Sequence, residues 1–253
     1  MKKVSIIIPY YKNINFFSQT LNSIKNQTFK DYEIIIIYDD TNKEELEPLK
    51  KILKNNKKIK LIVNKQNIGA GLSRNKAAKM AKGKYLAFID SDDLWHKDKL
   101  NYQLKFMEKK KLNISFTSYW IIDKMNKITS HRPVKKISTY NDLINSCDVG
   151  LSTAIIERNL FLKYKFSSNK TKEDYSLWLR LSKKMNIFGF KKKLTRWRKV
   201  DNSLSSSTTQ KLYDAYNIYY KQEKFNILVS LYRVFVLSYN FIKKSLNAKY
   251  NMR

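Results

Sequence analysis

The chain has 253 residues, of which 43% are hydrophobic, and this length allows one large domain or one domain with an appendage. Its formal net charge of +30 would suit nucleic acid, but only 8 of the 51 basic residues are arginines. The sequence has no helix-turn-helix, zinc-finger or RNA-binding aromatic motif, so we expect no nucleic-acid partner. Lysines spread along the whole chain still favour anionic substrates or an anionic membrane leaflet.

Cys147 is the single cysteine, so the sequence predicts neither an internal disulfide nor a cysteine-based metal site. The apolar run near the N-terminus is too short for a signal peptide and is closed by Pro9. We therefore expect the active region to face the cytoplasm.

Apolar runs alternate with amphipathic segments over the first 90 residues. Strands are predicted at 4–11, 32–40, 58–64 and 84–90, and helices at 13–29, 42–56 and 70–83. This alternation predicts an α/β domain with a mainly parallel sheet and helices on its faces. Ligands of such sheets bind beyond the carboxyl ends of the strands. Acidic side chains gather at those ends.

The middle of the chain is less regular. Residues 113–123 have strand character, 139–147 a short helical pattern, and 149–164 a strand followed by a helix. Residues 171–184 predict a helix whose first turn carries Glu173 and Asp174. Acidic residues at a helix N-terminus complement the helix dipole, which is the structural alternative to a chemical role.

The chain changes character after Ser203, where a polar segment precedes a region without strands. We expect a catalytic domain over residues 1–204 and a basic helical tail over 205–253. Residues 225–242 are apolar around most of a helix, except for a stripe that contains Arg233 and two asparagines. These polar residues disfavour a membrane span. An interfacial helix on an anionic membrane, and a helix docked on the domain or a partner, both remain open.

Asp90, Asp92 and Asp93 directly follow the buried strand that ends at Ile89. Carboxylates this close repel one another and raise each other's pKa unless a cation lies among them. Oxygen ligands suit Mg²⁺ or Mn²⁺, which also bind substrate phosphates. One aspartate could instead cap the helix expected next, but three exceed what a cap requires.

Three acidic groups therefore need a joint explanation: Asp39 with Asp40, the cluster at 90–93, and Glu173 with Asp174. A nucleotide-sugar transferase would use all three. One carboxylate would accept a hydrogen bond from a nucleobase, a metal-bound cluster would neutralise a leaving diphosphate, and a third would deprotonate an attacking hydroxyl.

Four segments in this order resemble the family 2 glycosyltransferases: SIIIPYYKN, QTFKDYEIIIIYDD, NIGAGLSRNKAAKMAKGKYLAFIDSDDLW and KEDYSLWLRL. The resemblance covers residues 1–200 or so. It implies the GT-A fold, a Rossmann-like α/β domain with a mixed, mainly parallel sheet. Within the family the chain is similar to bacterial enzymes that build capsule, exopolysaccharide or lipopolysaccharide sugars.

The resemblance places the donor nucleotide beside these strand ends. Asp40 would bind the base and Asp39 would support it, but Thr41 and Asn42 stand where the family often has Gly-Ser, so either aspartate remains a candidate. Arg74 would contact phosphate or pair with the aspartate cluster. The expected donor contacts are Pro9, Tyr10, Asp39, Asp40, Asn67, Gly69, Arg74, Asp90 and Ser91.

Asp90-Ser91-Asp92 matches the family's DxD signature, which implies bound Mn²⁺ or Mg²⁺. Asp92 is the expected metal ligand, and Asp90 and Asp93 are further candidates.

Asp174 matches the family's catalytic base. It would deprotonate an acceptor hydroxyl for direct displacement, which inverts the anomeric configuration. Glu173, Trp178 and Arg198 are candidate substrate contacts; for Trp178 a core position is the favoured alternative, and Arg198 could equally be a surface residue.

The resemblance implies a nucleotide-diphosphate sugar, with UDP as the expected nucleotide, and a glycan or lipid-linked saccharide acceptor. The QxxRW signature of processive synthases is absent, which favours single addition. Together with the basic tail, these expectations place the enzyme in the cytoplasm, at the periphery of the inner face of the membrane.

Two other functions stay open. A sugar-phosphate nucleotidyltransferase would need a glycine-rich loop after the first strand, and SIIIPYYKN has no glycine. A catalytically inactive module that binds the membrane surface is disfavoured because Asp40, Asp90, Asp92 and Asp174 are all present.

Overall fold

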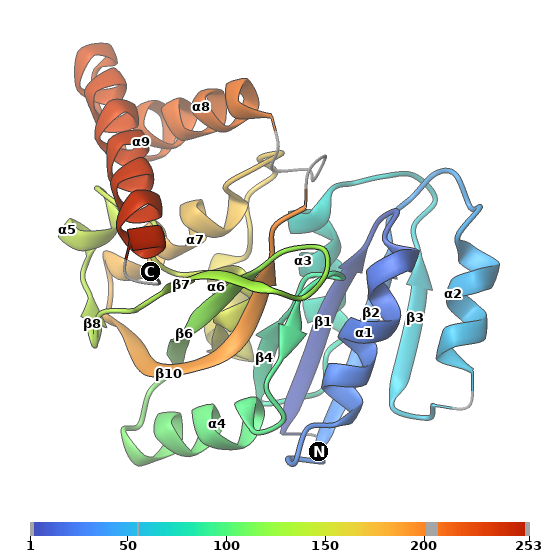
Figure 1. Ribbon diagram of the computed structural model, residues 1–253. Coiled ribbons are helices and arrows are strands. Elements are labelled where there is room, and N and C mark those ends of the chain that lie inside the picture. Colours follow the sequence, from blue (N-terminus) through green and yellow to red (C-terminus); the bar gives the residue numbers. More distant parts are fainter. Residues whose placement is uncertain (1–2, 55, 201–206, 251–253) are drawn as a thin grey trace.

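One mixed sheet organises the molecule, which is a computed structural model describing residues 3–54, 56–200 and 207–250. Its strands run in the order β3-β2-β1-β4-β9-β6-β10-β5, with β7 beside β6 and β8 beside β10 (Figure 1). The strands are β1 (Val4–Tyr10), β2 (Tyr32–Tyr38), β3 (Ile59–Val63), β4 (Tyr85–Phe88), β5 (Leu94–Trp95), β6 (Ile114–Ile122), β7 (Ile128–Arg132), β8 (Ile137–Ser138), β9 (Ile155–Glu157) and β10 (Ile187–Arg198).

The helices are α1 (Ile14–Lys25), α2 (Leu46–Leu53), α3 (Ala70–Met80), α4 (Lys99–Lys109), α5 (Tyr140–Leu143), α6 (Arg158–Tyr164), α7 (Glu173–Ser182), α8 (Thr208–Asn217) and α9 (Ile227–Tyr250), with a 3₁₀ turn η1 (Leu151–Thr153) and a π-helical turn η2 (Ile218–Gln222).

The N-terminal half of the sheet is parallel: β1 pairs with β2 and β4, and β2 pairs with β3. Successive isoleucines of β1 enter two cores on opposite faces. Ile6 and Ile8 pack in the core with α1, α2 and α4, whereas Ile7 packs in the core with α3, α6 and α7. A strand covered on both faces has a nearly continuous apolar sequence, which is why these strands were predictable.

The C-terminal half makes the sheet mixed, as predicted. β9 is antiparallel to β4 and β6, β6 and β10 run parallel, and β5 is antiparallel to β10. Strand β10 was not predicted from the sequence. Its lysine run at 191–193 breaks the apolar alternation, and the pairing with β6 shifts register on both sides of Lys193.

The predicted helix cap after the aspartate cluster is wrong. The chain first forms β5, because Leu94 and Trp95 pair with Arg196 and Thr195 of β10. Helix α4 begins only at Lys99 and is preceded by Asp98, so none of the aspartates at 90–93 caps it.

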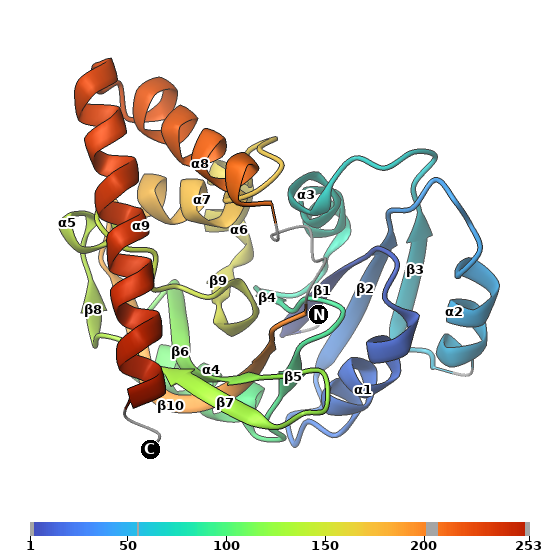
Figure 2. The ribbon, with the colours of Figure 1, turned by 45° about the horizontal axis from the view of Figure 1, so that its top comes forward.

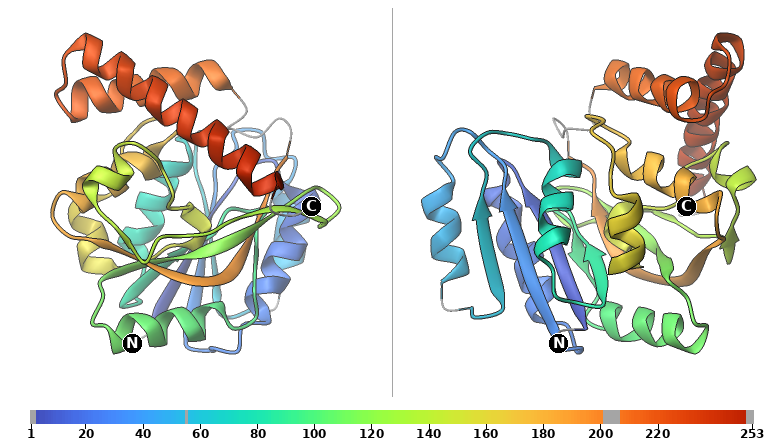
Figure 3. Two further views of the ribbon diagram at one scale, coloured as in Figure 1. Left: turned by 60° about the vertical axis from the view of Figure 1, so that its left-hand side comes forward. Right: turned by 180° about the vertical axis from the view of Figure 1, so that it is seen from behind.

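The C-terminal helices pack onto the domain. Side chains of α8, η2 and α9, including Tyr219 and Leu237, enter the same buried core as α7. The hydroxyls of Tyr175 and Tyr219 lie 2.8 Å apart, and each also bonds a carbonyl of the 143–144 segment. Figures 2 and 3 show α8 and α9 as the outermost layer on this side. The predicted boundary at 204/205 lies outside the described residues.

Candidate active site

The DxD turn follows β4 at the carboxyl edge of the parallel strands. The backbone N–H of Asp90 donates to Ser152 Oγ at 3.1 Å, and that of Asp93 donates to the carbonyl of Asp90 at 3.2 Å. Asn13 Nδ2, just beyond β1, donates to Ser91 Oγ at 2.9 Å. The turn is therefore closed by its own backbone hydrogen bond and held by groups from two other segments.

Arg74 joins this turn to the helix that carries the proposed base. From α3, its Nη2 donates to Asp90 Oδ1 and its Nη1 to Glu173 Oε1, both at 2.6 Å. The arginine is only 4% exposed. A buried arginine that bridges two carboxylates in this way fixes their geometry as well as their charge. Asp90 and Glu173, 83 residues apart in the sequence, are thereby brought to one place.

Asp174 lies partly buried in the first turn of α7, next to this bridge. Its Oδ1 accepts the backbone N–H of Tyr175 at 2.7 Å. Burial, together with the charge of Glu173, raises the pKa of Asp174 to about 7. A carboxyl group with this pKa is well matched to proton transfer near neutral pH.

The aspartates of the DxD turn differ in environment. Burial and the neighbouring Asp90 raise the pKa of Asp92 to about 6. Asp93 is fully buried: its Oδ1 accepts the N–H of Arg198 at 2.8 Å, and its Oδ2 has no hydrogen-bond partner in the part of the chain that the structure describes. Burial raises the pKa of Asp93 well above the usual range. Asp93 is therefore buried beneath the turn, whereas the side chains of Asp90 and Asp92 are partly accessible to solvent.

Within the described residues, no group of three or more His, Cys, Asp or Glu side chains is arranged to hold a metal ion. Mg²⁺ and Mn²⁺ do not need such a cage when one or two carboxylates act together with substrate phosphates. Asp90 and Asp92 fit that arrangement, because a cation would relieve the repulsion that raises the pKa of Asp92.

Arg198 supports the DxD turn from inside the protein. Its Nε donates to the carbonyl of Asp92 at 2.8 Å, its Nη1 to the carbonyls of Asp123 and Lys124, and its Nη2 to Gln19 Oε1 at 3.0 Å. The residue is 2% exposed, so the surface alternative for Arg198 is wrong. Its position below the turn makes it a positioning residue.

The two aspartates after β2 also separate in role. Asp39 is 2% exposed, and its Oδ1 accepts Asn64 Nδ2 at 2.7 Å and the N–H of Ile68 at 2.9 Å. Asp40 is 6% exposed, and among the described residues its Oδ1 accepts the N–H of Asn42 alone, at 3.2 Å. Asp39 thus holds the loop after β3, and Asp40 keeps more acceptor capacity for a ligand.

The loop between β3 and α3 is ordered around Asp39. Asn67 Nδ2 donates to the Asp39 carbonyl at 2.6 Å, and Asn67 Oδ1 accepts the N–H of Gly69 at 3.1 Å. Gly69 has φ of +84°, a conformation that favours glycine. Asn67 is exposed, and its contact with a donor stays a prediction.

Two expected aromatic contacts lie in the core. Tyr10 is fully buried; its hydroxyl donates to Glu45 Oε2 at 2.6 Å and its ring stacks on Tyr38. Its ring therefore does not line an open pocket, and neighbouring Pro9 is buried as well. Trp178 is also fully buried, which corresponds to the core alternative.

Three polar residues of the site were not identified from the sequence. Asn64 directly follows β3 and Asn13 lies three residues after β1, so the strand-end rule that selected the aspartates applies to them too. Ser152 lies in a short 3₁₀ turn without a sequence signal, and its role as a partner of Asp90 depends on the tertiary fold.

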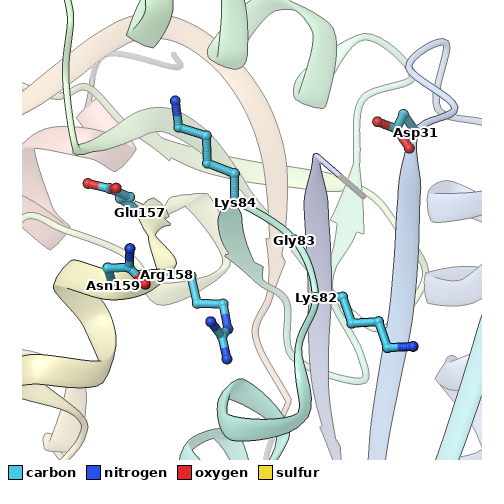
Figure 4. A pocket seen from close by; sticks show the side chains of 7 residues that line it. All are labelled: Asp31, Lys82, Gly83, Lys84, Glu157, Arg158 and Asn159. Atoms are coloured by element: carbon cyan, nitrogen blue, oxygen red, sulfur yellow. The ribbon is translucent and has the colours of Figure 1, made fainter. Parts of the chain in front are cut away.

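One cavity lies away from this site. It has a volume of about 830 Å³ and is formed where Asp31 and Gly83 precede β2 and β4, at the amino ends of the strands (Figure 4). A smaller cavity of about 370 Å³ includes Asp123 and Lys124, whose carbonyls bind Arg198. The smaller cavity therefore lies next to residues that hold Arg198.

Comparison with known proteins identifies the family. The model of glycosyl transferase family 2 matches residues 5–167. The chain belongs to this family. It is 30% identical over 248 residues to TuaG of Bacillus subtilis, a putative teichuronic acid biosynthesis glycosyltransferase, covering 96% of this chain and 97% of that protein.

Other family 2 relatives include WfgD of Escherichia coli, named as a UDP-Glc:α-D-GlcNAc-diphosphoundecaprenol β-1,3-glucosyltransferase. It is 32% identical over 211 residues, which is 83% of this chain and 82% of WfgD. An uncharacterized glycosyltransferase of Rickettsia conorii is 37% identical over 199 residues, which is 78% of this chain. That protein is longer, and the chain spans only 33% of its length.

Solved structures confirm the predicted GT-A fold. S. aureus TarS residues 1–349 with UDP-GlcNAc superposes with a TM-score of 0.72 at 19% identity, covering 90% of this chain and 69% of that one. The mannosyltransferase PcManGT of Pyrobaculum calidifontis, with GDP-Man and Mn²⁺, gives 0.68 at 13% identity, covering 91% and 69%.

Proposed function

We propose that this family 2 glycosyltransferase moves a sugar from a UDP-sugar to a hydroxyl of a lipid-linked saccharide in bacterial surface polysaccharide synthesis. The observation that carries the proposal is the Arg74 bridge. By pairing with both Asp90 and Glu173, it sets the proposed base Asp174 beside the DxD turn. A donor diphosphate at the turn and an acceptor at the base would then meet.

The reaction would be a single direct displacement. Asp174 takes the proton of the acceptor hydroxyl, whose oxygen bonds to the anomeric carbon as the bond to the diphosphate oxygen breaks, so the configuration inverts. Asp40 accepts a hydrogen bond from the base of the donor. Asp92 and Asp90 would hold Mn²⁺ or Mg²⁺, which would offset the charge of the leaving diphosphate.

The relatives support the choice of substrates. WfgD and WfaP of Escherichia coli are named for transfer from UDP-Glc to a diphosphoundecaprenol-linked GlcNAc, and TarS was solved with UDP-GlcNAc. PcManGT was solved with Mn²⁺, which supports a divalent cation here. With an undecaprenol-linked acceptor, the transfer proposed here would occur at the inner face of the membrane.

The test is release of nucleoside diphosphate from a panel of nucleotide sugars, with Mn²⁺ and a polyprenyl-diphosphate GlcNAc acceptor. We expect turnover with a UDP-sugar and a loss of about 10²-fold or more in Asp174→Asn and Asp92→Asn. Glu47→Gln, at an exposed salt bridge on α2, serves as the control and should retain full activity.

Product analysis completes the test. Retention of anomeric configuration, or full activity of Asp174→Asn, would contradict the proposed mechanism. Turnover that needs no divalent cation would contradict the role of Asp90 and Asp92.

A further inference from the structure

Helix α9 turns Leu237 and several polar side chains toward the domain and leaves a row of large apolar side chains exposed. Large apolar residues that recur every three or four positions are 54–79% exposed. We call them the outer stripe: Leu228, Leu231, Phe235, Tyr239, Ile242 and Leu246. At 3.6 residues per turn these positions fall within an arc about 100° wide and extend for about 27 Å.

The opposite side of α9 is fixed to the domain by hydrogen bonds. Arg233 Nη1 donates to Asn145 Oδ1 at 2.6 Å, and Asn240 Nδ2 donates to the Asn145 carbonyl at 2.9 Å. Lys244 pairs with Asp148, and Arg132 of β7 donates to the Lys244 carbonyl at 2.6 Å. The polar stripe seen in the sequence is therefore the docked face, and the outer stripe is presented outward.

Soluble helices normally bury their apolar face, so a contiguous apolar stripe of this length indicates a binding surface. We infer that the outer stripe of α9 is a membrane-binding surface, and that its occupant is an anionic phospholipid bilayer. This inference extends the proposed function, because a lipid-linked acceptor is presented at such a bilayer.

The charge around the stripe selects a bilayer over a second copy of the chain. Lys221 and Lys224 are exposed just before α9 and Lys243 lies on it, and no acidic residue follows Glu223. Lysines beside an apolar helix face attract anionic headgroups. Two copies meeting through this face would instead bring their lysines together.

The outer stripe also begins on the side of the molecule to which the carboxyl ends of the parallel strands point. In Figure 1 the strands β1 to β3 run upward to their carboxyl ends, and α8 and the beginning of α9 rise on that same side. Exposed Tyr213 and Tyr220 of α8 and η2 lie near this end, and tyrosine suits the headgroup region. No helix in the described residues is long and apolar enough to cross a bilayer, so the helix would lie along the surface.

The test is co-sedimentation of the full chain with vesicles of phosphatidylcholine, with and without phosphatidylglycerol. We expect binding to the anionic vesicles that falls by about tenfold or more in the double variant Leu231→Gln/Phe235→Gln, since both side chains lose burial in lipid. Met125→Gln is the matched control, because Met125 is 84% exposed but lies on the β6–β7 turn.

Three outcomes decide the inference. Undiminished vesicle binding by the double variant, or equal loss in the control, would overturn it. A dimer in light scattering that the double variant abolishes, without vesicle binding by the wild type, would assign the stripe to a second copy. Circular dichroism checks that the variants fold, and the assay needs no nucleotide sugar, so its result is independent of whether the proposed transfer occurs.

Discussion

The carboxyl of Glu173 raises the pKa of Asp174, so Glu173→Gln should move the pH dependence of turnover. Gln at this position keeps an oxygen that can accept from Arg74 Nη1, which now lies 2.6 Å from Glu173 Oε1. The substitution removes the negative charge that raises the pKa, and it leaves the charge of Arg74, which lowers it, less neutralised. Both changes favour the ionised base.

The magnitude follows from the fraction of ionised Asp174. With a pKa of about 7, the wild type at pH 6 has about one tenth of its base ionised, and kcat/KM should be about one tenth of its plateau. If the like charge contributes about 1.4 kcal/mol, the fraction at pH 6 in Glu173→Gln should rise to about one half.

The assay is the pH profile of kcat/KM at saturating Mn²⁺, with Glu108→Gln as a control that removes a carboxylate paired with Lys3 far from the site. The control should follow the wild type. A profile that is unchanged in Glu173→Gln, or shifted to higher pH, would refute the electrostatic account of the base.

Two further substitutions test the buried residues Arg198 and Lys99. Arg198→Lys keeps the charge but loses most of the hydrogen bonds that hold the DxD turn, so the unfolding free energy measured in urea should fall by about 3 kcal/mol. A fall of less than about 1 kcal/mol would argue against the supporting role of Arg198. Burial lowers the pKa of Lys99 to about 7, and the unfolded chain binds this proton up to a pH of about 10, so wild-type stability should rise between these values. Lys99→Met should flatten that rise and increase stability at pH 7 by on the order of 2 kcal/mol, and a destabilised variant would contradict the assignment.

The parallel half of the fold was predictable because its strands are buried on both faces. Isoleucine runs such as the one at 34–37 give an unambiguous strand signal, and the carboxyl-end rule then places Asp40 and Asp90 at one edge. The mixed half was harder, since β10 carries Lys191–Lys193 within a strand and pairs with a distant segment.

The site was predictable in its acidic residues but not in their partners. Whether Asp39 or Asp40 faces a ligand depends on Asn64, which binds Asp39 across 25 positions of sequence. The orientation of α9 on the domain could not be predicted from the sequence either. Its two stripes are visible in the sequence, but only the contacts of Asn145 show which one is docked.

The paired hydroxyls of Tyr175 and Tyr219 have a mechanical consequence. Tyr175 follows the proposed base, Tyr219 belongs to the turn that leads into α9, and both are fastened to the 143–144 carbonyls. A displacement of α9 would therefore be passed to the first turn of α7, which carries Asp174, through these two tyrosine side chains and not through the sheet. If the outer stripe binds a bilayer as we infer, the way in which α9 is held at that surface would then affect turnover.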